Sequence, residues 1–268
     1  MSATVVAMHQ SVAAIDVLWD LDGTLVDSEI LAMRVAVSTL VGTFDLDGGE
    51  RPGLADDLAQ RWAGLSFQQM LERCEQKHGV LDDTARRELI ISARAATLAA
   101  LASVEATPGI LDTLTEVAEG GGRNSVVTSS GMERVAVCLR STGLMAAFAD
   151  GHGGHRIFSA ATLGLPLKPA PDVYRHAVDE LGTDPATTVA VEDSVPGVRA
   201  AGGAGIGAVV GYVGGSHIAP ALRGAHVAAL RLAGASIVVE RGVDLAPAVG
   251  RAAATLSISP PPALGREL

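Results

Sequence analysis

The segment VLWDLDGTLVDSE, residues 17–29, places two carboxylates one residue apart at the end of an apolar run. Asp20 and Asp22 would repel each other, and burying either ionised group costs free energy unless a partner compensates its charge. A bound cation would supply that compensation. Two neighbouring acids can also share a reaction at phosphorus, because one carboxylate can attack while the other protonates the leaving oxygen and later activates water.

Three further polar segments carry groups that suit the same chemistry. They are VVTSS with Thr128 and Ser129, LKPAPD with Lys168, and VEDS with Glu192 and Asp193. A hydroxyl and an ammonium bind phosphoryl oxygens well, and carboxylates are the hard oxygen ligands that Mg²⁺ prefers. We therefore expect Thr128, Ser129 and Lys168 to bind a phosphoryl group. The acids Asp20, Asp22, Glu192 and Asp193 are the candidate Mg²⁺ ligands.

Short apolar runs alternate with helical patterns on either side of these segments. Strands are predicted at residues 15–20, 125–128, 156–158, 188–192, 206–211 and 236–239. Helices are predicted at 110–120, 131–143, 171–182 and 195–204. This alternation predicts an α/β fold with a Rossmann-like parallel sheet covered on both faces. In such sheets, ligands bind at the carboxyl ends of the strands, where the polar segments would lie together.

A long helical block separates the first predicted strand from the others. Residues 29–105 show apolar positions at helical spacing and no convincing strand, so they are expected to form an all-helical cap domain inserted into the core. The core would then comprise residues 15–28 and 106–248. Residues 1–14 are expected to be an N-terminal tail, and 249–268 a loose C-terminal tail ending in the Pro-rich SISPPPALGREL.

Composition narrows the class of partner. The 268-residue chain has a net charge of −10 and no basic patch, which argues against nucleic acid. The uncharged stretch at residues 200–222 holds seven glycines, so it is not expected to cross a membrane. Cys74 and Cys138 lack metal-ligand spacing, and the N-terminus lacks a signal-peptide pattern. We expect a cytoplasmic protein, monomeric or homodimeric, that binds a small phosphorylated metabolite.

The motifs DLDGT, VVTSS, LKPAPD and VEDS, in this order, resemble the haloacid dehalogenase-like phosphohydrolases, and in particular the subgroup with a helical cap after the first strand. The resemblance implies that Asp20 is the nucleophile and a Mg²⁺ ligand. It also implies that Asp22 is the general acid/base and binds Mg²⁺ through its carbonyl. Thr128 and Lys168 would bind the phosphoryl group. Asp193 would ligate the metal, and Glu192 would do so directly or through water. Gly23 and Thr24 would support the site, with Thr24 orienting Asp22.

The β-phosphoglucomutase-like members are the nearest alternative. They typically carry a His ten residues after the second Asp and an Arg after a G-x-S stretch in the cap, where this chain has Ala32 and Phe67. Both departures favour a Mg²⁺-dependent phosphatase of sugar or sugar-acid phosphates over a phosphosugar mutase. A non-catalytic regulatory module of the same fold is the third reading, and the intact acid pair disfavours it. His217, in the stretch YVGGSH, is a candidate substrate contact.

Overall fold

A six-stranded parallel sheet forms the centre of the larger lobe in the computed structural model, which describes residues 15–46, 54–62 and 65–257. The strand order is β3-β2-β1-β4-β5-β6, so β1 lies in the middle between β2 and β4. In chain order, the strands are β1 (Asp16–Trp19), β2 (Arg123–Thr128), β3 (Ile157–Ser159), β4 (Val189–Glu192), β5 (Ala208–Tyr212) and β6 (Ile237–Val239).

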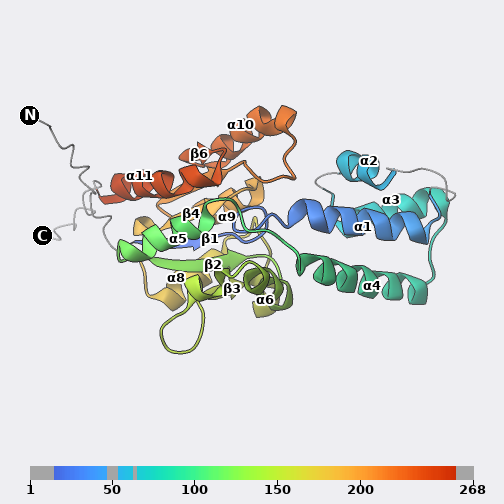
Figure 1. Cartoon of the computed structure of the whole chain (residues 1–268), viewed down its shortest axis with the longest axis horizontal. Helices are drawn as coiled ribbons and strands as arrows, with labels where there is room; N and C mark the ends of the chain where they lie inside the picture. The colour runs from blue at the N-terminus through green and yellow to red at the C-terminus, as the bar shows by residue number, and fades with distance from the viewer. Residues whose placement is uncertain (1–14, 47–53, 63–64, 258–268) are drawn as a thin grey trace, which may run out of the picture.

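Helices cover both faces of this sheet and form a second lobe beyond its carboxyl edge (Figure 1). The α-helices are α1 (Glu29–Thr43), α2 (Leu54–Arg61), α3 (Phe67–His78), α4 (Asp83–Leu101), α5 (Ile110–Glu119), α6 (Met132–Ser141), α7 (Ala160–Leu163), α8 (Asp172–Leu181), α9 (Val195–Gly203), α10 (Arg223–Ala233) and α11 (Leu245–Ser257). The 3₁₀ helices are η1 (Leu144–Phe148), η2 (Pro185–Thr187), η3 (Pro220–Leu222) and η4 (Gly242–Asp244).

Side chains along each buried strand point alternately to the two faces of the sheet, so the apolar core is divided between those faces. Val17 and Trp19 of β1 face α5, α6 and α11, whereas Leu18 faces α8, α9 and α10. Successive side chains of a strand point to opposite faces, and both faces here are covered, so every residue of β1 is buried. The continuous apolar runs in the sequence are explained by this double burial.

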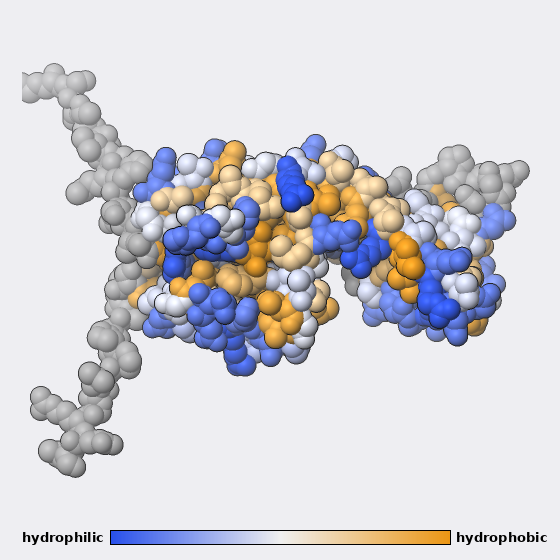
Figure 2. Space-filling model, turned by 90° about the horizontal axis from the view of Figure 1, so that it is seen from below, coloured by the Kyte–Doolittle hydropathy of each residue, from blue (hydrophilic) through white to orange (hydrophobic). Residues whose placement is uncertain are grey.

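Helices α1–α4 form the smaller lobe, the cap, which has its own apolar core around Val37, Leu40 and Leu71. Two chain segments connect it to the sheet domain. They run side by side, because Val26 bridges Ala106 in an antiparallel sense and the N–H of Asp27 donates to Glu105 O at 3.0 Å. Figure 2 shows the constriction where these segments join the two lobes. The predicted α/β fold with an inserted helical cap is therefore confirmed.

The C-terminal region differs from its prediction. Residues 249–257 are not a loose tail but continue α11, in which Val249, Ala252 and Ala253 are buried against the sheet. These small apolar residues provide the narrow stripe that a helix needs for packing on a sheet. Helix α10 also lies where no element was predicted. Within the described ranges, no helix is both long and apolar enough to span a bilayer. The predicted tails 1–14 and 258–268 lie outside the described residues.

Candidate active site

The strand order brings the predicted polar segments together at one edge of the sheet. Asp20 follows β1, Thr128 ends β2 and Glu192 ends β4, and these three strands are neighbours. Because the strands are parallel, their carboxyl ends lie at the same edge. Lys168 reaches this edge from the segment between α7 and α8. The sequence-predicted residues thus come from segments more than a hundred positions apart and meet in one place.

Three buried carboxylates form the centre of the site. One ligand oxygen from each of Asp20, Glu192 and Asp193 lies within 4.8 Å of those of the other two. All three residues are buried, and Glu192 is fully so. Burial raises the pKa of Asp20 well above its ordinary value, with the charge of Lys168 opposing this and those of Glu192 and Asp193 adding to it. The excess of negative charge and the all-oxygen donor set fit a Mg²⁺ ion.

Lys168 is the one ammonium within this cluster of described side chains. Its Nζ donates to Asp20 Oδ1 at 2.6 Å, to Glu192 Oε1 at 2.5 Å and to the carbonyl oxygen of Val127 at 2.8 Å. Burial alone lowers the pKa of Lys168, but the charges of Asp20 and Glu192 outweigh this effect and raise the pKa above its ordinary value. The side chain therefore stays protonated and occupies a fixed position beside Asp20.

Two residues outside the predicted motifs support this ion pair. Tyr174 of α8 donates its hydroxyl to Glu192 Oε1 at 2.6 Å, and its ring centroid lies 5.2 Å from Lys168 Nζ. Gly197 of α9 leaves room for Glu192, because a Cβ at that position would lie 1.8 Å from Glu192 Oε2. The latter oxygen has no hydrogen-bond partner among the described residues. Tyr174 and Gly197 each follow a predicted motif by only a few positions. Neither was predicted as a site residue, because a tyrosine or a glycine at such a spacing does not by itself indicate catalysis or metal binding.

The predicted phosphoryl-binding hydroxyls lie at the end of β2. Thr128 is buried, and its Oγ1 accepts from the N–H of Ser130 at 3.0 Å, which leaves the hydroxyl proton available to a ligand. Ser129 Oγ accepts from the N–H of Lys168 at 3.3 Å. Ser129 thus ties the Lys168 segment to the end of β2.

Asp22 faces away from this cluster and toward the cap. Its carboxylate accepts hydrogen bonds from Ser28 at 2.5 Å and Ser130 at 2.6 Å, and it pairs with Arg134 of α6, whose Nε lies at 2.8 Å. Arg134 also lies 3.8 Å from Glu29, the first residue of α1. Arg134 was not predicted from the sequence, since an arginine in the first turn of an amphipathic helix carries no distinguishing signal.

Thr24 does not orient Asp22 as predicted. Thr24 is fully buried, and its Oγ1 has no hydrogen-bond partner among the described residues, while its carbonyl accepts from Thr107 at 2.6 Å. The neighbouring Gly23 lies close to the carboxylate cluster. Its φ of +79° suits glycine, and a Cβ would lie 2.1 Å from Asp193 Oδ2. The missing side chain allows the loop to approach Asp193, one of the candidate metal ligands.

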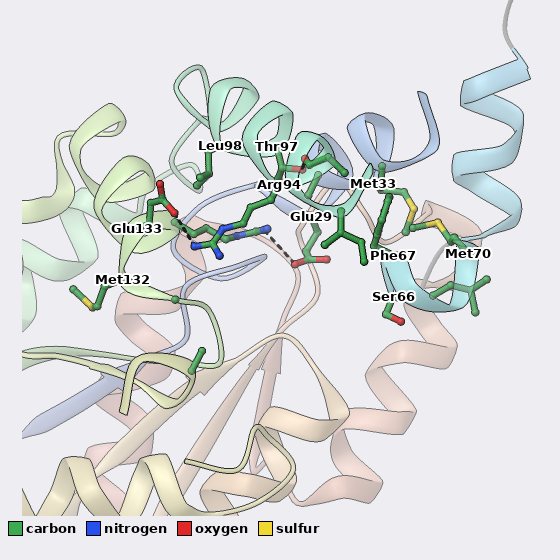
Figure 3. Close-up of a pocket in the computed structure, with 18 of the residues that line it drawn as sticks. Glu29, Met33, Ser66, Phe67, Met70, Arg94, Thr97, Leu98, Met132 and Glu133 are labelled. Atoms are coloured by element: carbon green, nitrogen blue, oxygen red, sulfur yellow. Dashed lines mark hydrogen bonds and ion pairs between the residues drawn. The ribbon is translucent and has the colours of Figure 1, made fainter. Parts of the chain in front are cut away.

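A cleft of roughly 800 Å³ lies between the cap and the core (Figure 3), and the ion pair with Arg134 joins Asp22 to its lining. Arg134 and Glu29 border the cleft, and Arg94 of α4 pairs across it with Glu133 of α6 at 2.7 Å. Its lining also includes Ala32 and Phe67, the two positions at which this chain differs from the mutase-like proteins. The other lining residues are Met33, Ala36, Leu65, Ser66, Met70, Ile90, Ala93, Thr97, Leu98, Gly131, Met132, Ala161 and Thr162. His217, predicted as a substrate contact, is not among them.

Comparisons with known proteins agree with this geometry. The family model described as "Haloacid dehalogenase-like hydrolase" matches residues 17–210. The Protein CbbY of Cereibacter sphaeroides is 30% identical over 209 residues, which cover 72% of this chain and 82% of that protein. Hexitol phosphatase B of Escherichia coli K12 is 29% identical over 72% of this chain and 81% of its own length. A solved haloacid dehalogenase-like protein of unknown function from Agrobacterium tumefaciens has a TM-score of 0.71 at 30% identity, covering 90% of this chain and 100% of that one.

Proposed function

Because the chain belongs to the haloacid dehalogenase-like hydrolases, we propose that it is a Mg²⁺-dependent phosphatase that hydrolyses small phosphorylated metabolites, sugar or sugar-acid phosphates, through an aspartyl phosphate on Asp20. The observation that carries this proposal is the different environment of the two acids in DLDGT. Asp20 lies among buried charges beside Lys168, whereas Asp22 pairs with Arg134, and Arg134 lines the cleft. The first environment suits a nucleophile, and the second suits an acid/base.

The first half-reaction transfers the phosphoryl group to the enzyme. A carboxylate oxygen of Asp20 attacks phosphorus, and the bond from phosphorus to the ester oxygen breaks. Lys168 and Thr128 bind the phosphoryl oxygens and offset their charge. The leaving alcohol lies in the cleft, where the carboxyl group of Asp22 gives it a proton. Ser28, Ser130 and Arg134 hold the Asp22 carboxylate in position before substrate binds.

The second half-reaction regenerates the carboxylate. Asp22, now ionised, takes a proton from water, and the water oxygen attacks the phosphorus of the aspartyl phosphate. Asp20 leaves as a carboxylate, and inorganic phosphate is released. Asp20, Asp193 and the carbonyl of Asp22 would hold the Mg²⁺, with Glu192 as a direct or water-mediated ligand. When bound, the ion neutralises charge on the carboxylates and on the phosphoryl group.

The cleft lining also weighs against the mutase alternative. A mutase must bind a second phosphate and move a proton on the sugar, for which mutase-like proteins carry a cap Arg and a His. The corresponding positions are Phe67 and Ala32, and both line the cleft with apolar atoms. Water can therefore act as the acceptor of the phosphoryl group. A cytoplasmic location and a monomeric or homodimeric state stay predictions.

Phosphate release from a panel of phosphate monoesters, with Mg²⁺ and with a chelator, tests the proposal. The wild-type chain should release phosphate only with Mg²⁺, and Asp20→Asn should lose the activity. Asp179→Asn changes an exposed aspartate on α8 and serves as the matched control. Activity that persists in Asp20→Asn would show that another group is the nucleophile. Interconversion of hexose phosphates faster than phosphate release would favour the mutase.

A further inference from the structure

The glycine-rich loop at residues 213–218, between β5 and η3, lies beside the proposed metal site, although the mechanism above gives it no role. His217 Nε2 lies 3.3 Å from Asp193 Oδ2. The side chain of Asp193 is 7% exposed and that of His217 is 24% exposed, so water screens this contact only partly. His217 therefore contacts a candidate metal ligand other than Asp20 and Glu192, the two acids that pair with Lys168.

Close backbone approaches hold the His217 ring in place. A Cβ on Gly23 would lie 2.9 Å from His217 Cε1, and a Cβ on Gly215 would lie 2.7 Å from the same atom. Both values are shorter than ordinary contacts to a Cβ, so the ring fits between two glycines that leave it space. Asp193 Oδ2 lies against the same face of Gly23. The ring and the carboxylate are thus packed against one loop, and few other rotamers of His217 are open to it.

The surrounding contacts fix the backbone at both ends of this arrangement. His226 Nε2 lies 2.6 Å from the carbonyl oxygen of Asp193, so α10 holds the main chain of the ligand. The N–H of Ser216 donates to Asp27 Oδ1 at 3.1 Å, which anchors the loop to the segment that leads into the cap. With these backbones held, the rotation of the Asp193 carboxylate is the remaining freedom, and His217 is the side chain that restricts it.

We propose that His217 is a positioning residue for the divalent cation, acting through a hydrogen bond from Nε2–H to Asp193 Oδ2 that sets the rotation of the ligating carboxylate. The inference rests on the metal site of the proposed function. Hydrogen bonds to ligating carboxylates are known to matter for affinity, and their loss typically weakens metal binding by about 10–100-fold. His217 would then act on cation affinity and not on the substrate.

Cation binding without substrate tests this directly, with Mn²⁺ as the probe and its unbound fraction measured by electron paramagnetic resonance. His217→Leu fills the space of the ring without a donor and should weaken Mn²⁺ binding about 10–100-fold. His217→Gln retains an N–H donor at similar reach and should restore most of the affinity. His152→Ala removes an exposed histidine from another loop and should bind Mn²⁺ as the wild type does. Melting temperatures without metal establish that each variant is folded.

The outcomes separate this inference from the proposed function. Wild-type affinity in His217→Leu would overturn the positioning role and leave the phosphatase proposal intact. Equal weakening in His217→Leu and His217→Gln would also overturn it, since packing and not the hydrogen bond would then control affinity. A wild-type chain that binds no Mn²⁺ would overturn both. At saturating Mg²⁺, His217→Leu should recover its kcat, whereas loss of a residue that binds substrate would not be recovered by metal.

Discussion

The substitution Gly197→Ala tests whether the buried Glu192 is as tightly fixed as the structure indicates. The added Cβ would lie 1.8 Å from Glu192 Oε2 and 2.1 Å from its Cδ, so the carboxylate must move by more than 1 Å to reach ordinary contact. Glu192 is fully buried, and that movement would break its hydrogen bonds from Lys168 and Tyr174. Overpacking costs about 1–3 kcal/mol, and a buried charge that loses its partner adds a few kcal/mol.

Gly202→Ala supplies a matched control on the same helix. A Cβ at Gly202 would meet nothing within 4 Å, so the substitution should stabilise α9 by about 0.5–1 kcal/mol through reduced backbone entropy of the unfolded chain. The two variants should therefore differ by about 3 kcal/mol or more in the free energy of unfolding. Only Gly197→Ala should also lose phosphatase activity, because it displaces Lys168 from Asp20.

Urea denaturation at neutral pH, followed by far-ultraviolet circular dichroism, measures the two free energies. Both variants should retain the slope of the wild type, so that the midpoints report the difference. If Gly197→Ala proved as stable and as active as Gly202→Ala, Glu192 would have a second low-energy position, and its pairing with Lys168 would not be needed to hold the site together.

Three further predictions concern ionisable side chains that differ in how deeply they are buried. Lys168→Met leaves two buried acids unpaired and should lower the metal-free unfolding free energy by about 3–5 kcal/mol, with Mg²⁺ restoring part of it; unchanged metal-free stability would contradict the ion pair. Arg94→Ala breaks a pair whose side chains are 70% and 58% exposed, so chemical denaturation should show a loss below about 1 kcal/mol. Burial raises the pKa of Cys138 to about 12, so its thiol should resist a disulfide reagent at pH 8 until the chain unfolds. The unfolded thiol ionises near pH 9 and the folded one only near pH 12, so the free energy of unfolding should fall as pH rises from about 9 to about 12.

The sequence was sufficient to predict the sheet and the carboxylate cluster because both depend on local patterns. Strands buried on two faces appear as apolar runs, and a parallel sheet brings all its carboxyl ends to one edge. The positions of Asp20, Glu192 and Asp193 follow from those two facts without knowledge of any side-chain direction. Helix α11 was missed because its Ala-rich stripe resembles a loose, small-residue tail until the sheet face that it covers is known.

The partners of Asp22 could not be predicted, for a different physical reason. Arg134 lies 112 positions away on a helix whose rotation about its own axis determines whether the side chain faces the cleft or the solvent. Thr24 lies only two positions from Asp22, yet the turn directs its hydroxyl into the core. The family resemblance therefore implied a partner that Asp22 does not contact here, while the actual one depended on how the second strand and α6 pack beside the first.

The spacing of the two acids in DLDGT has a further consequence for the cap. Asp20 interacts with groups of the core alone, namely Lys168 and the neighbouring carboxylates, and is insulated from the cap by burial. Asp22 is instead held by Ser28, at the root of α1, and by Arg134, which also lies near Glu29. Any movement of the cap about its two connecting segments must alter the contacts of Asp22 and need not alter those of Asp20. The proposed nucleophile can thus remain fixed while the proposed acid/base responds to movement of the cap, because one intervening residue places the two carboxylates in separate parts of the structure.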